Sequence, residues 1–473
     1  MKETLERELK LSVDPGFELP PLPVETTPRR LRALYYDTSD HRLARHGVTL
    51  RRRSEDGRDL WQLKLPADGA RLELEWEADD SQVPGEITWL LTAYVRGREL
   101  LPIAELHTLR RAVRLTAGGQ PAAEVVHDTV EVLEDNRVVR TFDEVEVEQI
   151  GPGAERLMAR VEKQLRAAGA RSSDGRAKVF QALDLPAPGG PRVAHDAPAI
   201  EHLRAYLQLQ VAALVTSDPP TRRGSDKGVH GMRVATRRMR SALKEAQRLL
   251  DPAWVGETRR ELKWLGDVLG EVRDPDVFSA YVEREVRTLG ESAAQGGADL
   301  VALIRSQSEG SRARLAEALD SARYLALLER LEATAESLPV TPERESLGKI
   351  LRRAARRTRR KLRGVSARSD DVALHDLRIA AKRARYAAEL AEELVGAAAR
   401  RLAKRAEAVQ TVLGEHQDAA VAEQRLEALA AHATPAAAYV AGRLAERQRD
   451  RRAAARAKFP EAAKRLARAA RKL

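Results

Sequence analysis

The pattern of apolar and polar residues changes near residue 190. Before that point, short runs alternate apolar and charged residues with a period of two, as in residues 71–76 and 144–148. This alternation is typical of β-strands, whose successive side chains point to opposite faces of a sheet. After residue 190, long stretches rich in Ala, Leu, Arg and Glu repeat their apolar residues with a helical period. The pattern predicts a β-domain followed by an all-helical domain.

A segment rich in proline and glycine, residues 186–196, separates the two patterns and would interrupt either a helix or a central strand. We therefore expect a β-domain over residues 1–185, a linker over 186–196 and a helical domain over 197–473.

The distribution of charge follows the same division. Residues 1–190 hold 28 Lys and Arg against 33 Asp and Glu, a net charge of −5, whereas the remainder carries +16 and the whole chain +11. This asymmetry indicates two domains with different partners.

Composition excludes several classes of protein. The 473 residues include no Cys, which rules out disulfide scaffolds, thiolate metal sites and cysteine nucleophiles. No window holds about 18 consecutive apolar residues, so no membrane-spanning helix and no membrane partner are expected. The first residues are polar and lack the apolar core of a signal peptide. We therefore expect a cytoplasmic protein.

Several predicted strands of the first domain place their charged residues on one face. These same-face sets are Glu6, Glu8 and Lys10; Arg51 and Arg53; and Glu144, Glu146 and Glu148. For any one strand, a sheet with one face in solvent would explain why its charged residues share a face. Closure of the sheet into a barrel would instead bring the carboxylate sets and the cationic sets into one lumen. Carboxylates are the hard ligands that Mg²⁺ or Mn²⁺ prefer, and Arg and Lys bind phosphate, so the combination favours a metal–phosphate site.

These residues also carry a family resemblance. The run Glu6-Arg-Glu8-Leu-Lys10 resembles the ExExK signature of the CYTH superfamily, the triphosphate tunnel metalloenzymes. The segments that follow fit the same family in order: Tyr35-Tyr-Asp37-Thr, Gly47-Val-Thr-Leu-Arg51-Arg-Arg53, Trp61-Gln-Leu-Lys64 and Glu144-Val-Glu146-Val-Glu148. The resemblance covers roughly residues 1–185. It implies an eight-stranded antiparallel β tunnel, or barrel, that binds triphosphate-containing compounds with a divalent metal.

The resemblance implies a role for individual residues. Phosphate would be held by Lys10, Arg51, Arg53, Lys64, Arg111, Arg114 and Lys178. The metal, Mg²⁺ or Mn²⁺, would be bound by Glu6, Glu8, Glu146, Glu148 and Asp128, with Glu75 and Glu144 as further candidates. The expected catalytic residues are Glu6, Glu8 and Lys10. Ala177 stands where the family commonly has a serine before the closing lysine, so Arg176 is an alternative to Lys178.

The second domain contains two copies of one unit. Residues 230–240 and 375–385 both match H-x-x-R-x-A-x-[RK]-R-x-R, and residues 268–277 match 412–421 around a shared Val-Leu-Gly-Glu. The same two blocks recur in the same order at nearly equal spacing, which indicates an internal duplication over about 197–335 and 342–473. On a helix, each first block places its His, Arg and Lys residues on one face, opposite an apolar stripe.

These blocks resemble the CHAD domain, a histidine-marked helical domain that often follows CYTH in one chain. The resemblance spans about residues 197–473 and implies two pseudo-symmetric helical bundles whose basic helices line a groove for inorganic polyphosphate. The residues expected to bind it are His230, Arg233, Arg237, Arg238, Arg240, His375, Arg378, Lys382, Arg383 and Arg385. A basic run over 352–361 would support them, and Asp274 and Asp418 either cap helices or orient arginines. The alternative is an exposed basic face that pairs with neighbouring helices.

The sequence thus predicts an α+β two-domain protein, and the leading functional hypothesis joins both domains. The CYTH-like tunnel would be a metal-dependent inorganic triphosphatase that hydrolyses triphosphate or short polyphosphate, while the CHAD-like domain holds long polyphosphate. The alternative is a non-catalytic polyphosphate-binding protein that localises to polyphosphate granules. Nucleic-acid binding is disfavoured, because the basic half lacks aromatic stacking platforms and a recognised base-reading motif. Adenylate cyclase activity, also found in the CYTH superfamily, is disfavoured by the absence of a pattern for adenine recognition.

Overall fold

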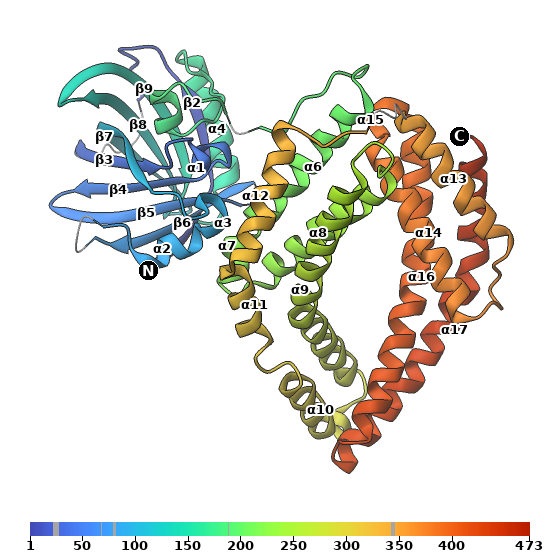
Figure 1. The fold of residues 1–473 in the computed structure, drawn as a ribbon. Helices are drawn as coiled ribbons and strands as arrows, with labels where there is room; N and C mark the ends of the chain where they lie inside the picture. The colour runs from blue at the N-terminus through green and yellow to red at the C-terminus, as the bar shows by residue number, and fades with distance from the viewer. Residues whose placement is uncertain (22–27, 68, 79–81, 188, 342–345) are drawn as a thin grey trace. The chain divides into compact units, whose positions relative to one another are not determined.

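The computed structural model describes residues 1–21, 28–67, 69–78, 82–187, 189–341 and 346–473 (Figure 1). These residues form two compact units, 1–189 and 190–473. The first unit is built around an antiparallel sheet and the second is helical, which confirms the predicted α+β fold class. Pro188 of the expected linker and residue 342, the expected start of the second helical copy, lie outside the described residues. No described helix combines the length and apolarity needed to cross a membrane.

Ten strands form one antiparallel sheet in the part of the first unit that the structure describes. They are β1 (Lys2–Glu6), β2 (Glu8–Ser12), β3 (Arg29–Asp37), β4 (Thr49–Glu55), β5 (Arg58–Ala67), β6 (Ala70–Glu77), β7 (Leu101–Ala117), β8 (Gln120–Glu134), β9 (Arg137–Gln149) and β10 (Arg171–Ser172). Their order across the sheet is β1-β6-β5-β4-β3-β7-β8-β9-β2-β10.

The first strands close this sheet into a barrel. Only Arg7 separates β1 from β2, yet β1 pairs with β6 and β2 pairs with β9, on opposite sides of the sheet order. One continuous segment therefore joins both edges of the sheet formed by β3 to β9. Counting β1 and β2 as one strand, and leaving out the two-residue β10, gives the eight strands that the family resemblance implies.

Short helices surround the barrel wall. They are α1 (Arg42–Arg45), α2 (Gly85–Leu90), α3 (Thr92–Val95), α4 (Ala154–Ala167) and α5 (Lys178–Ala182). Helix α4 packs its apolar face, including Leu157, Val161 and Leu165, on valines of β7, β8 and β9 that point away from the lumen. Because valine and glutamate alternate along β9, the same strand that packs against α4 presents its carboxylates to the barrel interior.

The second unit consists of helices. They are α6 (Ala199–Thr216), α7 (Asp218–Arg222), α8 (Asp226–Glu245), α9 (Pro252–Arg287), α10 (Ala294–Ser306), α11 (Ser311–Asp320), α12 (Ala322–Glu336), α13 (Leu347–Arg363), α14 (Asp371–Leu390), α15 (Glu392–Val395), α16 (Ala397–Ala430) and α17 (Pro435–Arg471), with a 3₁₀ turn at Glu291–Ala293.

The two sequence copies adopt corresponding helices. The His/Arg blocks lie on α8 and α14, and each is followed by a long helix, α9 or α16, that packs against it (Figure 1). Helix α8 buries Met232, Ala235, Met239 and Leu243, and α14 buries its matching residues Leu377, Ala380, Ala384 and Ala388. The apolar stripes therefore face the helical cores, which leaves the basic face of each helix outside them. The two motif helices also contact each other.

Candidate active site and anion-binding groove

A cavity of about 120 Å³ lies in the lumen of the barrel. Its cationic lining residues are Lys10, Arg51, Arg53, Lys64, Arg71, Arg110 and Lys178. Its acidic lining residues are Glu6, Glu8, Glu73, Glu75, Glu146 and Glu148. Most of these side chains occupy alternate positions of a strand, because residues i and i+2 project to the same face. Strands that are far apart in the sequence thereby place both charge types around one small volume.

Most of the residues that the sequence predicts for this site line the cavity, but Arg111, Arg114, Asp128 and Glu144 are not among its lining residues. Arg110 takes the lumen position: it lies opposite Asp128 in the β7–β8 ladder, and its guanidinium donates to both carboxylate oxygens of Asp128, at 2.9 and 2.7 Å. Arg111 points to the opposite face and is exposed. Arg114 shares the face of Arg110, but its side chain is 65% exposed and pairs with Glu124. Phosphate binding by Arg111 in the lumen therefore does not agree with the structure.

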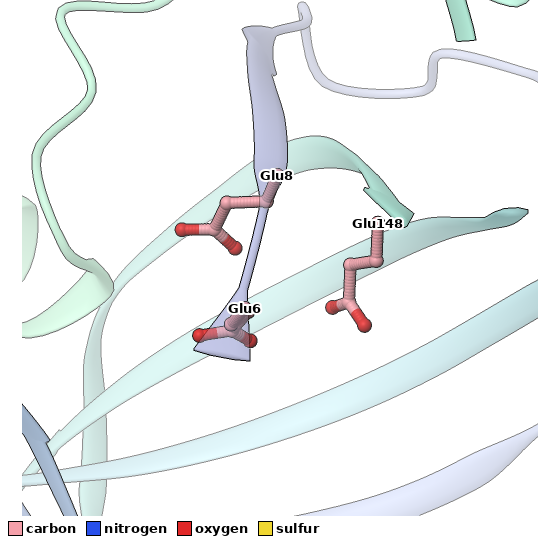
Figure 2. A group of neighbouring side chains, drawn as sticks. All are labelled: Glu6, Glu8 and Glu148. Carbon is pink, nitrogen blue, oxygen red and sulfur yellow. The ribbon is translucent and has the colours of Figure 1, made fainter. Parts of the chain in front are cut away.

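Two groups of three carboxylates lie close enough together to hold a metal ion. In the first group, ligand oxygens of Glu6, Glu8 and Glu148 lie within 4.8 Å of one another. Figure 2 shows these side chains extending from β1, β2 and β9. The second group meets the same distance criterion and consists of the buried Asp128, Glu144 and Glu146. The predicted metal ligands are thus divided between the two groups.

Cations of the protein itself already neutralise the second group. The Lys178 ammonium lies 3.1 Å from Asp128 and 3.0 Å from Glu146, and it also pairs with Glu144. Lys10 donates to Glu146 at 2.5 Å. Burial alone would raise the pKa of Glu146, but Lys10, Lys178 and Arg110 together lower that pKa well below its ordinary value. This group therefore has little remaining attraction for a further cation.

The cations of the protein compensate the first group less completely. Burial, together with the neighbouring carboxylates of Glu146 and Glu6, raises the pKa of Glu148 to about 7, although Arg110 and Lys64 act in the opposite direction. Glu6 is paired with Lys64 at 2.6 Å, and Lys10 lies 3.5 Å from Glu8. Three oxygen donors that repel one another suit a hard divalent cation, which would relieve the repulsion. Of the two groups, Glu6, Glu8 and Glu148 fit a metal better.

Arg51 is a lumen cation whose main partners are uncharged. Its Nε donates to Gln62 at 2.7 Å, and its Nη1 donates to the Tyr35 hydroxyl at 3.0 Å. These neutral partners hold the guanidinium in place without cancelling its charge, so it remains available to an anion. Burial alone would raise the pKa of Tyr35, but the positive charges of Arg51, Lys178 and Lys64 lower it.

Sequence reasoning missed several lining residues, including Tyr35 as a lumen group, Gln62, Arg71, Glu73 and Arg110. The signal for two of them was present, because Arg71, Glu73 and Glu75 alternate with apolar residues along β6. Tyr35 and Gln62 carry no charge, and only the register that places them beside Arg51 reveals their role.

In the second unit, the basic faces of the two motif helices converge. Arg237 of α8 donates to the Tyr386 hydroxyl of α14 at 3.2 Å. Burial, and the charges of Arg237, Arg378 and Arg240, lower the pKa of Lys382 to about 8. Lys382 therefore lies partly buried, with three guanidinium groups near its ammonium group. We refer to Arg237, Arg240, Arg378 and Lys382 as the groove cluster, after the groove that the family resemblance implies.

The second repeated block positions the first. Arg233 of α8 pairs with Asp274 of α9 at 2.5 Å, and a methyl group at Gly270 would lie 3.6 Å from its guanidinium. In the other copy, Gly414 has the same relation to Arg378, at 3.7 Å. Asp274 and its counterpart Asp418 both lie inside long helices, so neither caps a helix. The glycine leaves room for the arginine to lie across the helix, and Asp274 fixes its guanidinium.

The remaining predicted polyphosphate residues have varied environments. His230 is exposed, and burial together with Arg273, Arg237 and Arg233 lowers its pKa. His375 lies 3.2 Å from the Gln417 side chain. Two further residues lie near the phenol of Tyr206 rather than the groove cluster, namely Arg238 and Arg385. Arg385 is paired with two carboxylates, Glu389 at 2.7 Å and Glu407 at 3.1 Å.

Comparison with protein families agrees with both units. Residues 4–175 match the CYTH domain, and residues 205–427 match the CHAD domain. The chain belongs to the CYTH-CHAD proteins. The barrel is therefore its CYTH domain and the helical unit its CHAD domain, which confirms the resemblance that the sequence motifs carry.

Similar proteins cover nearly all or part of this chain. An uncharacterized protein of Mycobacterium tuberculosis strain H37Rv, Rv2226, is 31% identical over 504 aligned positions, covering 98% of this chain and 96% of the relative. Among solved structures, PptA from Streptomyces chartreusis is 23% identical, with a TM-score of 0.47 over 56% of this chain and 99% of its own. The CHAD domain of the plant Ricinus communis is 27% identical, with a TM-score of 0.45 over 60% of this chain and 96% of its own.

Proposed function

We propose that the CYTH domain hydrolyses inorganic triphosphate and short polyphosphate with Mg²⁺ or Mn²⁺. The observation that carries the proposal is the lumen, where the Glu6, Glu8 and Glu148 group borders the same 120 Å³ cavity as seven Arg and Lys side chains. A ligand that carries charges of both signs can interact with both sets of lumen residues. A metal-bound triphosphate does so, because its cation meets the carboxylates and its phosphate oxygens meet the cations.

In this reaction, a water oxygen bonds to the terminal phosphorus while the bond from that phosphorus to the bridging oxygen breaks. The products are phosphate and pyrophosphate, and the protons of the water are distributed between them and the solvent. Glu6, Glu8 and Glu148 would hold the divalent cation, which when bound polarises phosphate oxygens and acidifies a coordinated water. Charge that builds up on the leaving pyrophosphate would be stabilised by Lys10, Arg51 and the other lumen cations.

The test compares the wild type with Glu6→Ala/Glu8→Ala. Phosphate release is measured from triphosphate, ATP and long polyphosphate, with Mg²⁺ or Mn²⁺ and with the metal removed by chelation. We expect metal-dependent turnover of triphosphate that falls by about two to three orders of magnitude in the variant. A matched control, Glu134→Ala/Glu155→Ala, removes two exposed carboxylates outside the lumen and should retain activity. Absence of turnover with every substrate would contradict the enzymatic function and leave the lumen as a binding site.

We further propose that the CHAD domain binds long inorganic polyphosphate along α8 and α14. The groove cluster supports this, because four cations from two helices approach one another without an equal number of acids. A polyphosphate chain would neutralise them, and its affinity should fall steeply with salt as counterions are released. Arg237→Gln/Arg378→Gln should weaken polyphosphate binding, as measured by titration at several salt concentrations. Binding without any turnover by the CYTH domain would favour the non-catalytic alternative.

A further inference from the structure

Helix α13 carries a dense basic face that the two repeated motifs do not include. Nine of its 17 residues are Lys or Arg and none is acidic. Its apolar side, including Ile350, Leu351 and Ala354, is buried. Arg352, Arg356 and Arg360 are exposed and follow one another at intervals of four residues, so they form a stripe about 12 Å long. Among the residues that the structure describes, none of the three has a carboxylate partner.

This stripe is connected to the groove helices through one buried carboxylate. Glu245, the last residue of α8, has a side chain that is only 3% exposed. Its carboxylate lies 3.6 Å from Arg357 of α13 and 4.0 Å from Arg383 of α14. The Glu245 backbone carbonyl also accepts a hydrogen bond from Arg353 at 3.2 Å. The end of α8 thus brings α13 and α14 together at one point.

Two further cations, Arg259 and Lys244, interact with the groove cluster or with this junction. The pKa of Arg259 is lowered by burial and by the charges of Arg240 and Arg383. The pKa of Lys244 is lowered by burial and by Arg383, Arg259 and Arg357, against the opposing effect of Glu245. Positive charges therefore follow one another from the groove cluster to α13, and the carboxylate of Glu245 acts on Lys244, Arg357 and Arg383. We refer to Lys244, Arg259, Arg357 and Arg383 as the bridge.

The chemistry of these residues favours a flexible inorganic polyanion over nucleic acid. Helix α13 contains no aromatic residue, so its stripe offers no surface on which a base could stack. On a helix, Arg357 lies about 100° from Arg356, and Arg356 points directly away from the buried face. A ligand that follows the bridge must therefore turn around α13. Duplex DNA resists bending at this scale, whereas a single phosphate chain does not.

We propose that a long polyphosphate chain bound in the groove continues over the bridge and is held a second time by the exposed arginine stripe of α13. This inference rests on the proposed binding of polyphosphate by the groove. Two contact regions on one chain make the second contact intramolecular, so it raises affinity without any change in the groove. A short chain reaches the groove alone and gains nothing from the stripe.

The test uses the full chain and two variants with equal loss of charge. Arg356→Gln/Arg360→Gln alters the stripe, and Arg284→Gln/Arg287→Gln alters exposed arginines near the end of α9. Affinities for a short oligophosphate and for long-chain polyphosphate are measured at several salt concentrations. We expect the stripe variant to bind the long chain about tenfold or more weakly. Its slope of log affinity against log salt should fall by roughly 0.7 for each arginine removed. Its short-chain affinity, and both affinities of the control, should match the wild type.

Other results would overturn the inference in distinguishable ways. If the stripe variant keeps its long-chain affinity while Arg237→Gln/Arg378→Gln loses it, the groove binds polyphosphate and the stripe does not. An equal loss for short and long chains would show that the stripe arginines act through the groove instead of holding a second segment. Binding of duplex DNA, but not polyphosphate, through the stripe would assign it to nucleic acid. Absence of polyphosphate binding by the wild type would overturn the proposed groove function as well. Circular dichroism of each variant checks that its helices are intact.

Discussion

At the scale of single residues, Lys382 is the groove side chain whose protonation is most sensitive to its neighbours. Burial comes first among the causes, and Arg237 and Arg240 of α8 and Arg378 of α14 add to it, bringing the pKa to about 8. An ordinary lysine stays charged far above neutral pH. This one loses its proton close to physiological pH when no anion is bound, because burial and three neighbouring guanidinium groups both disfavour its charged form.

The affinity of the groove for polyphosphate should therefore depend on pH. A polyanion binds the protonated lysine better, so affinity should be highest below pH 8 and should decline by less than tenfold per pH unit as pH rises through about 8. Arginine keeps its charge over this range, so Lys382→Arg should remove most of the decline. Titrations with polyphosphate at constant ionic strength between about pH 7 and 9 measure this decline in affinity. Lys404→Arg, at an exposed position on α16, is the control, and equal pH dependence in both variants would contradict the role of Lys382.

The alternation of charges predicts which residues of β1, β2, β4 and β9 face the lumen, but it does not do so for β7. Leu106, Leu109 and Val113 do not keep a period of two, so the sequence alone does not show whether Arg110 or Arg111 points inward. The pairing of Arg110 with Asp128 decides it, and that register depends on contacts with both neighbouring strands. For the same reason, the division of the carboxylates into a neutralised and an available group could not be predicted.

At the scale of elements, helix α10 packs closely on its neighbours through two adjacent glycines. A methyl group at Gly296 would lie 2.4 Å from the carbonyl oxygen of Ala436, at the start of α17. One at Gly297 would lie 2.4 Å from a methyl of Val286, on α9. These distances are far shorter than normal contacts, so the helices would have to separate. The helical period predicts α10, but only the packed structure shows why glycine occupies these positions.

Gly296→Ala should therefore destabilise the CHAD domain although alanine is the better helix former. We expect a loss of about 1–3 kcal/mol in its free energy of unfolding, because backbone atoms must move to admit the methyl group. Gly442→Ala is the matched control, since this glycine lies within α17 and no heavy atom lies within 4 Å of an added methyl group. That variant should be more stable by up to about 1 kcal/mol. Urea or thermal unfolding of the full chain measures both, and equal effects would contradict the close packing of α10.

The duplication of the helical unit could be predicted from the sequence, but the contacts between its two repeated blocks could not. The His/Arg blocks and the Val-Leu-Gly-Glu blocks reveal a duplication because they recur in the same order at nearly equal spacing. Their function depends on a helix crossing that brings Gly270 under Arg233 and Gly414 under Arg378. A helical period predicts which residues share a face, but not which other helix that face meets.

At the scale of the whole molecule, the chain consists of two units with separate cores. The clusters of buried apolar residues around α4 and α5 belong entirely to residues 1–189, and the cluster that joins α9, α10, α16 and α17 belongs entirely to residues 190–473. Units with their own cores can fold on their own. The two proposed activities should thus be separable.

Cleavage at a protease site introduced into residues 186–196 tests this separation. The fragment 1–185 should retain metal-dependent triphosphate hydrolysis with kcat/KM within about twofold of the intact chain, and the fragment 197–473 should retain polyphosphate affinity. Phosphate release and titration, after purification of each fragment, provide the two measurements. Loss of turnover in the first fragment would show that hydrolysis requires the CHAD domain.

The segment that closes the barrel also has a consequence for how the CYTH domain is made. Strands β1 and β2 are synthesised first, but their partners are residues 71–75 and 144–148. The neighbouring pairs β4–β5, β5–β6, β7–β8 and β8–β9 are adjacent in the sequence and close short loops, so they should form early. The pairing of β2 with β9, which closes the barrel, must wait until β9 has emerged from the ribosome. Until then the barrel cannot close and β2 and β8 each lack the partner that β9 provides, so the nascent domain is most exposed to aggregation during this interval.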